Sequence, residues 1–422
     1  MRRITALVVS GLLVAGVLAA VVWNLAGPTP QRVTGVIGSE KAAYFDDPDV
    51  VARLADLGYE VEVRTRGSRS IARADLDGAD FGFPGSDPSA EAFQREHGTE
   101  REYRPFYSPM VVLSHRPVAE ALREAGAAAE EDDGTWTLDM AAYLDLTEER
   151  TRWRDLPGGG YEGAGRSEVL VRTTDPRTSN SAAMYLAVIA YLLNGEEVPQ
   201  EPPAGGEAER IARLFLAQGA PPESSKQPFD QYAALGPGHT PLLWAYEAQY
   251  AGTRGSGTGL PDGAVVMYPA PTTVSNHTLL PLTDAGDEVG RLLTEDPELQ
   301  RLAAEHGFRT ADADQFAAAA EEAGRPVRAQ VADVVNAPAF EVVEGMLSGL
   351  ETAYADGGMP APAEEASGIG GDGADDGDSG GSSSDSDDGG GDTGTRDPRD
   401  GAAPARPPGA PPSRPDPNPE TA

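Results

Sequence analysis

One stretch constrains the fold more than any other, an apolar helix that follows directly on a loop of hydroxyl-bearing residues. Residues 182–193 are apolar almost all round, which predicts a helix buried inside a domain. The loop 173–181 before it is rich in residues that cap helices, and 168–173 has the β-branched content of a short strand. The first N–H groups of a helix have no intrahelical partner, so this end is either a structural cap or a site for a hydrogen-bond acceptor or anion. Three hydroxyls lie at it, those of Thr178, Ser179 and Ser181.

The chain before this stretch alternates strands with helices. Residues 32–37, 59–65 and 79–83 read as short strands, with helical segments between them. That alternation predicts a parallel sheet with crossover helices, and ligands bind beyond the carboxyl ends of such strands. The residues expected at those ends are Gly38, Ser39, Gly85 and Ser86.

A long extended segment, 103–114, leads out of this first unit. It carries two prolines, which predicts an edge or crossing strand rather than a central one. Helices expected over 117–129 and 138–146 follow, and a second strand and helix series begins near residue 168 and returns near residue 270. The sequence thus predicts two lobes joined by two crossing strands, a plan used for hinged closure around a cleft.

Composition excludes several classes of protein. The 422 residues carry a formal charge of -35, which disfavours nucleic acid and anionic lipid as partners. There is no cysteine, so a disulfide framework, a thiolate metal site and lipidation at cysteine are excluded. Lys41 and Lys226 are the only lysines, so nearly all positive charge is arginine, as expected of a GC-rich bacterial genome.

The N-terminus carries a candidate membrane segment. Residues 1–3 include two arginines and precede an apolar run over 4–26, which is near the length that spans a bilayer. We therefore expect residues 1–3 in the cytoplasm, 4–26 as a retained signal anchor, and 27–32 as a spacer to a body outside the cytoplasm. Secretion after signal cleavage is the alternative.

The C-terminal segment 356–422 is rich in Gly, Ser and Asp and then in Pro, which predicts a disordered acidic tail. It contains a serine-protease-like sequence, 377–381, in a tract that cannot pack around a nucleophile. The five histidines have no metal-binding spacing. We therefore expect no catalytic residues, no metal and no cofactor.

The order of several short motifs resembles a known family. VIGSEK, DFGFPGSD, YRPFYSPMVVLS, RTTDPRTSNSAAMYLAVIAYLLNG and LLWAYEAQY follow one another, and VVMYPAPTTVSNHTLLPL comes last. Together they look like an extracellular solute-binding protein of the type 2 periplasmic-binding fold, in an actinobacterial branch distantly similar to molybdate- and phosphate-binding proteins. The resemblance implies an α/β fold of two lobes, each a mostly parallel sheet flanked by helices. Lobe 1 would comprise 33–106 and 270–355, and lobe 2 would comprise 107–269.

The same resemblance implies a ligand-binding site between the lobes. In lobe 1 the implied contacts are Gly38, Ser39, Gly85, Ser86 and Ser108. In lobe 2 they are Thr178, Ser179, Asn180, Ser181, Tyr246 and Glu247. Hydroxyls and free N–H groups suit an oxyanion, whereas Glu247 and Asp87 would bring negative charge, so a polar organic or amine-bearing ligand stays open.

The expected function is capture of a small polar ligand, with an oxyanion as one candidate, for an ABC-type uptake system. The expected partners are that ligand, an ABC permease and the membrane through the N-terminal helix, with no nucleic acid. We expect a monomer without enzymatic activity. The alternative is a membrane-anchored sensor or interaction module that uses the same fold without transport.

Overall fold

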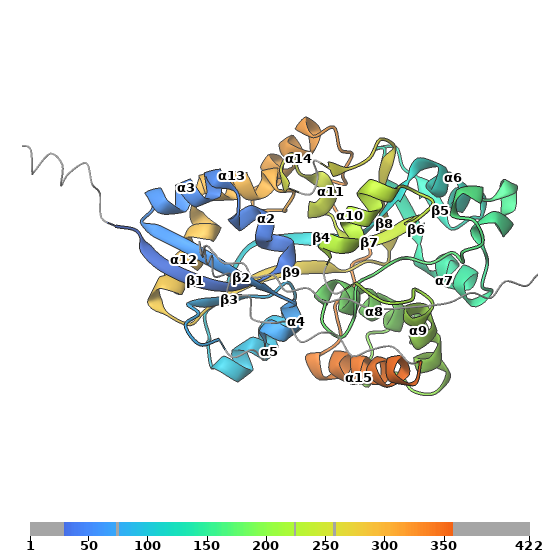
Figure 1. Cartoon of the computed structure of the whole chain (residues 1–422), viewed down its shortest axis with the longest axis horizontal. Helices are drawn as coiled ribbons and strands as arrows, with labels where there is room; N and C mark the ends of the chain where they lie inside the picture. The colour runs from blue at the N-terminus through green and yellow to red at the C-terminus, as the bar shows by residue number, and fades with distance from the viewer. Residues whose placement is uncertain (1–28, 73–75, 223–224, 256–258, 358–422) are drawn as a thin grey trace, which may run out of the picture. The chain divides into compact units, whose positions relative to one another are not determined.

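The computed structural model of the chain describes residues 29–72, 76–222, 225–255 and 259–357 (Figure 1). The predicted membrane segment 4–26 and nearly all of the predicted tail lie outside these residues. Within the described ranges, no helix combines the length and the apolar character that a membrane span needs.

The first lobe is built on a parallel sheet, as the alternating pattern predicts. Strand β1 (Gln31–Gly38) pairs in parallel with β2 (Tyr59–Arg66) on one side and β3 (Phe81–Phe83) on the other. The helical elements that connect these strands are η1 (Ser39–Lys41), α2 (Ala42–Phe45), α3 (Pro48–Asp56) and α4 (Ser68–Ile71), and α5 (Asp87–His97) follows β3. The carboxyl ends of β1 and β2 therefore meet at one edge of the sheet.

Strand β4 (Tyr103–His115) joins the two lobes. Its first part pairs with β9 (Val274–Pro281), and its second part lies between β7 (Leu242–Tyr246) and β8 (Ala264–Ala270). The sequence therefore predicts the crossing correctly but not the central position of the second part. Both prolines, Pro105 and Pro109, precede Met110, where the central pairing begins, so they do not interrupt it.

The second lobe contains a hairpin between the two predicted helices, 117–129 and 138–146, and the hairpin overlaps only their facing ends. Strands β5 (Ala128–Glu130) and β6 (Trp136–Asp139) pair antiparallel, and β6 pairs in parallel with β8. The helices beside them are shorter than predicted, α6 (Arg116–Glu124) and α7 (Met140–Glu148). Trp136 and Leu138 are fully buried, so packing of alternate side chains favours a strand here and delays the helix expected from residue 138.

The helix that the sequence singles out is α8 (Asn180–Leu193), and it is buried along most of its length, as predicted. Ile189 and Val188, neighbours on different faces, are both fully buried. The short strand expected over 168–173 is reduced to two isolated bridges, at Glu168 and Arg172. Further helices of this part are η2 (Trp153–Asp155), η3 (Pro157–Gly159), η4 (Glu162–Ala164), α9 (Gly206–Leu216), α10 (Lys226–Leu235) and α11 (Ala248–Ala251).

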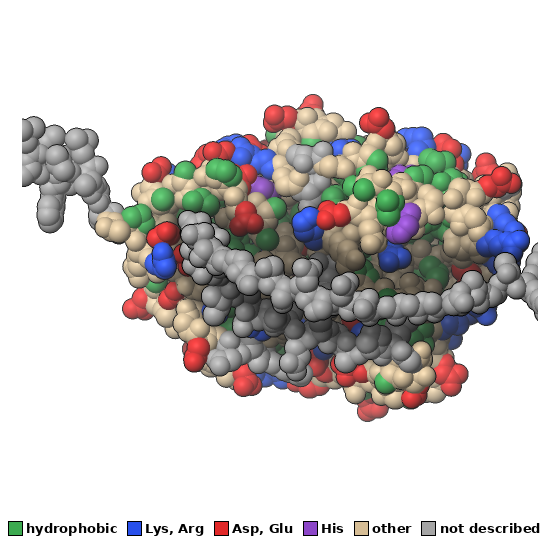
Figure 2. Space-filling model, viewed as in Figure 1, with side chains coloured by type: hydrophobic (Ala, Val, Ile, Leu, Met, Phe, Trp, Pro, Cys, Tyr) green, Lys and Arg blue, Asp and Glu red, His purple; other side chains and the backbone are tan. Residues whose placement is uncertain are grey.

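The last helices are α12 (Asp284–Glu295), α13 (Pro297–Glu305), α14 (Ala313–Glu322) and α15 (Phe340–Asp356). Helix α15 packs against α5 of the first lobe and also against α8 and α9 of the second. The predicted lobe boundaries stay a prediction, and α15 is the element that belongs least clearly to one lobe. On the face in Figure 2, acidic and basic side chains are interspersed over the surface.

Candidate ligand-binding site

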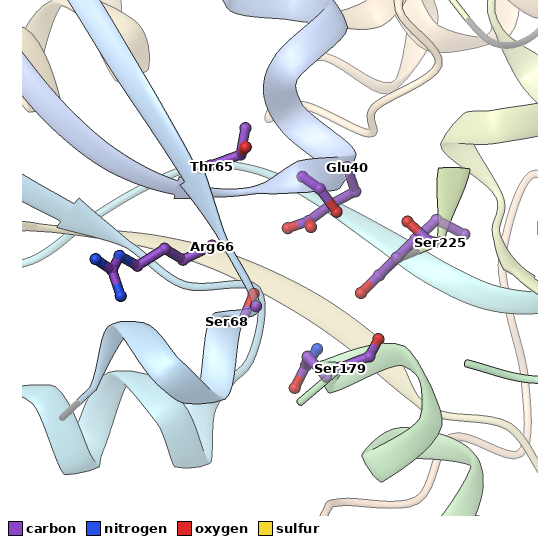
Figure 3. Close-up of a pocket in the computed structure, with 10 residues that line it drawn as sticks. Glu40, Thr65, Arg66, Ser68, Ser179 and Ser225 are labelled. Atoms are coloured by element: carbon purple, nitrogen blue, oxygen red, sulfur yellow. The ribbon is translucent and has the colours of Figure 1, made fainter. Parts of the chain in front are cut away.

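A small cavity of about 100 Å³ lies between the strand ends of the first lobe and the start of α8 in the second (Figure 3). Its first-lobe walls are Ser39, Glu40, Thr65, Arg66, Gly67 and Ser68. Its second-lobe walls are Ser179, Asn180, Ser225 and Tyr246. The lining is polar, with hydroxyl groups as its most frequent side-chain groups.

Topology explains why these first-lobe residues meet. Strand β1 ends at Gly38, and Ser39 and Glu40 begin the 3-10 turn that follows it. Strand β2 ends at Arg66, and Gly67 precedes α4. Because β1 and β2 are parallel, both turns lie at the same edge of the sheet, where α/β proteins bind their ligands.

Four of the residues implied by the sequence line this cavity, namely Ser39, Ser179, Asn180 and Tyr246. Two more, Gly38 and Gly85, lie behind its wall. A Cβ atom at Gly38 would come 2.3 Å from a carboxylate oxygen of Glu40, and one at Gly85 would come 2.9 Å from the same oxygen. Glycine at both positions leaves room for that carboxylate.

Three other implied residues do not line the cavity, and the hydroxyls of two of them have local partners. The Ser86 hydroxyl accepts from the backbone N–H of Ser89 and caps α5. The Ser108 hydroxyl is buried and accepts from the N–H of Ala248 at 3.1 Å. These are structural contacts. The Ser181 hydroxyl is buried without a partner among the described residues, but it also lies off the cavity.

Thr178 is an interlobe contact rather than a wall of the cavity. Its backbone carbonyl faces Gly67 so closely that a Cβ atom on the glycine would lie 2.2 Å from the oxygen. Its hydroxyl oxygen is buried without a partner among the described residues. A ligand role for any of the implied residues stays a prediction.

Glu247 brings no free negative charge to the cavity, contrary to the expectation from the sequence. It is fully buried, and the Arg309 guanidinium donates to both of its carboxylate oxygens, at 2.5 and 2.8 Å. The Tyr268 hydroxyl also donates to it. The pairing with Arg309 offsets the cost of burying the carboxylate.

Asn180 holds the two lobes together beside the cavity. Its amide nitrogen donates to the carbonyl oxygen of Gly85 at 3.0 Å. A second contact between the lobes is made by Arg69, whose guanidinium donates to the carbonyl oxygen of Pro176 at 2.8 Å. The lobes therefore meet directly on this side of the cavity.

A buried charged cluster that no local sequence pattern predicts lies under the cavity wall. The Lys41 ammonium is fully buried, donates to Glu40 and lies 3.2 Å from Nδ1 of His277. His277 is also fully buried, and its Nδ1 lies 3.4 Å from the Glu40 carboxylate. One signal could have pointed to this cluster, because Lys41 is one of two lysines in a chain that otherwise uses arginine.

The cluster fixes the charge of Glu40. Burial alone would raise the pKa of the Glu40 carboxyl, but the charge of Lys41 and the hydrogen bond with His277 outweigh it and hold that pKa far below its usual range. Burial, helped by the charge of Lys41, lowers the pKa of His277 to about 4. At neutral pH the cluster thus consists of an ionised Glu40 and a neutral His277 beside Lys41.

The fold and this site can be compared with known proteins. No protein-family model matches the sequence, and no curated protein matches it. Among solved structures, the chain is similar to a periplasmic thiamin-binding protein, with 12% sequence identity, a TM-score of 0.50, and coverage of 77% of this chain and 98% of that one. The chain therefore has the two-lobed type 2 periplasmic-binding fold, which confirms the predicted fold.

Two further solved structures align at lower scores. A periplasmic binding protein of Actinobacillus pleuropneumoniae with bound fructose-6-phosphate is 13% identical, with a TM-score of 0.47 and coverage of 77% and 98% of the two chains. A sulfate-binding protein of Mycobacterium tuberculosis is 15% identical, with a TM-score of 0.45 and coverage of 74% and 98%. At these identities the comparison concerns the fold and not the ligand.

Proposed function

We propose that this protein captures a small polar solute between its two lobes, outside the cytoplasm. One observation carries the proposal, the cavity that strand ends of one lobe and the start of α8 in the other enclose together. Its walls offer hydroxyl and amide groups, which suit a ligand bound by hydrogen bonds. The fold supports it as well, because two lobes on crossing strands can close around a ligand.

The proposal is tested by ligand-dependent thermal stability of the exported body. A panel of oxyanions, sugars, amino acids and amines is added to the protein, and a bound solute raises the melting temperature by mass action. The double variant Ser39→Ala with Ser179→Ala removes one hydroxyl from each lobe and should abolish that rise. Ser348→Ala, at an exposed position on α15, is the matched control and should retain it. A panel without any effect on the melting temperature would refute solute capture.

The finer part of the proposal concerns delivery and location. We infer that residues 4–26 remain as a membrane anchor and that the monomeric body delivers its solute to an ABC permease, with no reaction catalysed. N-terminal sequencing of the mature protein tests the anchor, because a terminus beyond residue 20 would mean cleavage. Loss of solute uptake after gene deletion would support delivery, whereas unchanged uptake would favour the sensor alternative.

A further inference from the structure

The cavity presents one negative charge with an open hydrogen-bonding position. The Glu40 side chain is 5% exposed, and its Oε1 receives the Lys41 ammonium. Its Oε2 accepts no hydrogen bond from the described part of the chain, although Glu40 lines the cavity. Figure 3 shows the Glu40 side chain extending from its turn toward the space between Ser68, Ser179 and Ser225.

Positive side chains near the cavity are turned away or engaged elsewhere. Lys41 is fully buried behind Glu40 and does not line the cavity. Of the ten described lining residues, Arg66 is the one with a positive charge, and Figure 3 shows its guanidinium pointing away from Glu40 and Ser179. Arg69 donates to backbone carbonyls and to Glu344. A ligand anion between Glu40 and Ser179 would therefore meet no guanidinium directed toward it.

The charges of Glu40 and Lys41 compensate one another, and the start of α8 adds about half a positive charge. The choice of ligand therefore depends on which atoms face the cavity. An ionised carboxylate oxygen only accepts hydrogen bonds, and a fully ionised oxyanion offers only acceptors, so the two repel. An ammonium group offers three donors and matches both the open carboxylate oxygen and the surrounding hydroxyl oxygens.

The net charge of the whole chain also favours a cationic ligand. A formal charge of -35 attracts cations toward the protein and lowers the local concentration of anions. Lys41 remains close to Glu40 and weakens its attraction for a second cation. It occupies Oε1, however, and leaves Oε2 to the cavity.

We propose that the cavity selects a small organic ammonium ion, whose N–H groups donate to Oε2 of Glu40 and to the neighbouring serine and threonine hydroxyls. This inference rests on the proposed solute capture and assigns its ligand class. Lys41 and His277 serve as positioning residues, because they hold the carboxylate in place without lining the cavity. The volume of about 100 Å³ suits the charged head of such a ligand.

Two probes of equal size separate charge from shape. Ethanolamine and ethylene glycol differ in one group, an ammonium in place of a hydroxyl. Titration calorimetry on the exported body measures the affinity for each compound. We expect ethanolamine to bind at least about tenfold more tightly, the minimum for a charge-assisted hydrogen bond in a buried site. Sulfate and phosphate should not bind. If ethylene glycol, sulfate or phosphate bound and ethanolamine did not, solute capture would stand and the ammonium inference would be overturned. If no compound of the wider panel bound, solute capture itself would be refuted.

Variants at the cluster connect the selectivity to Glu40. Glu40→Gln keeps the shape of the side chain and removes its charge, and should abolish the preference for ethanolamine. Because that variant leaves Lys41 buried and unpaired, a second variant, Glu40→Gln with Lys41→Met, removes both charges and keeps the fold. Glu62→Gln, at an exposed position of β2, removes one negative charge that does not line the cavity and should retain the preference. An unchanged preference in a folded double variant would overturn the assignment to Glu40.

Discussion

The amide nitrogen of Asn180, in the first turn of α8, donates to the carbonyl oxygen of Gly85, in the loop after β3. The two residues belong to different lobes, and the hydrogen bond closes one side of the cavity that Asn180 lines. The contact therefore links closure of the lobes to the geometry of the site. A change at Asn180 should alter ligand affinity more than it alters the stability of either lobe.

Asn180→Ala is expected to weaken ligand binding by roughly fivefold, because one hydrogen bond contributes about 1 kcal/mol to the closed state. The carbonyl of Gly85 still receives the Ser275 hydroxyl, so the fold should persist. Calorimetry with the ligand found in the panel measures the affinity. Asn194→Ala, at the other end of the same helix, is the control, and an equal loss of affinity in both variants would contradict a role for the interlobe bond.

Gly67→Ala should prevent full closure of the lobes. The added Cβ atom would lie 2.2 Å from the carbonyl oxygen of Thr178, well inside contact distance, so the lobes must separate to accommodate it. The φ of Gly67 is -59°, which alanine adopts without strain, so the first lobe should fold normally. Small-angle scattering should report a larger radius of gyration, and ligand affinity should fall.

Gly349→Ala is the matched control for that variant. An added Cβ atom there meets no neighbour within 4 Å, and alanine favours the helix α15 that contains it. It should leave scattering and affinity unchanged. If Gly67→Ala behaved in the same way, the contact with Thr178 would not limit closure.

How far the sequence predicts this structure depends on the range of the interactions involved. The strand ends, the crossing strand and the buried helix α8 follow from local patterns of apolar and turn residues. The cluster of Glu40, Lys41 and His277 does not, because His277 is separated from Lys41 by 236 positions. Only the pairing of β9 with β4 and β3 brings it under the cavity.

Burial explains the other differences between the predicted and the observed structure. The family resemblance implies Glu247 as a ligand residue, yet the carboxylate is buried against Arg309, which is 62 positions away. The helices predicted over 117–129 and 138–146 extend into the ends of the hairpin of β5 and β6, and the parallel pairing of β6 with β8 overrides the helical pattern at residues 138–139. Local propensity is a weak constraint wherever a distant strand supplies the packing.

Arg309→Met should destabilise the fold by about 3–5 kcal/mol, because it leaves Glu247 buried with a charge and no counter-charge. Urea denaturation followed by circular dichroism measures the free energy of unfolding. Arg101→Ala is the control, since Arg101 pairs with Asp287 at the surface, where such pairs contribute about 1 kcal/mol or less. A similar decrease in the free energy of unfolding in the two variants would mean that the Arg309–Glu247 pair contributes no more to stability than a surface ion pair.

His277 should make the stability of the protein depend on pH. Burial and Lys41 lower its folded-state pKa to about 4, below the ordinary value of 6.5. As the pH falls below 6.5, the unfolded chain binds a proton that the folded protein does not, so the free energy of unfolding decreases and this contribution is lost by about pH 4. Between pH 6.5 and 5 the expected loss from this residue is about 1.5 kcal/mol.

The slope of unfolding free energy against pH isolates this effect from the packing cost of a substitution. His277→Gln removes the titrating ring and should flatten the slope between pH 6.5 and 5, whatever its effect on stability at pH 7. His115→Gln should flatten it as well, because burial also lowers the pKa of His115 to about 4. His239 is exposed, so His239→Gln should keep the full slope. An unaltered slope in His277→Gln would show that the ring takes up its proton at the same pH in the folded and the unfolded protein, which would contradict a lowered folded-state pKa.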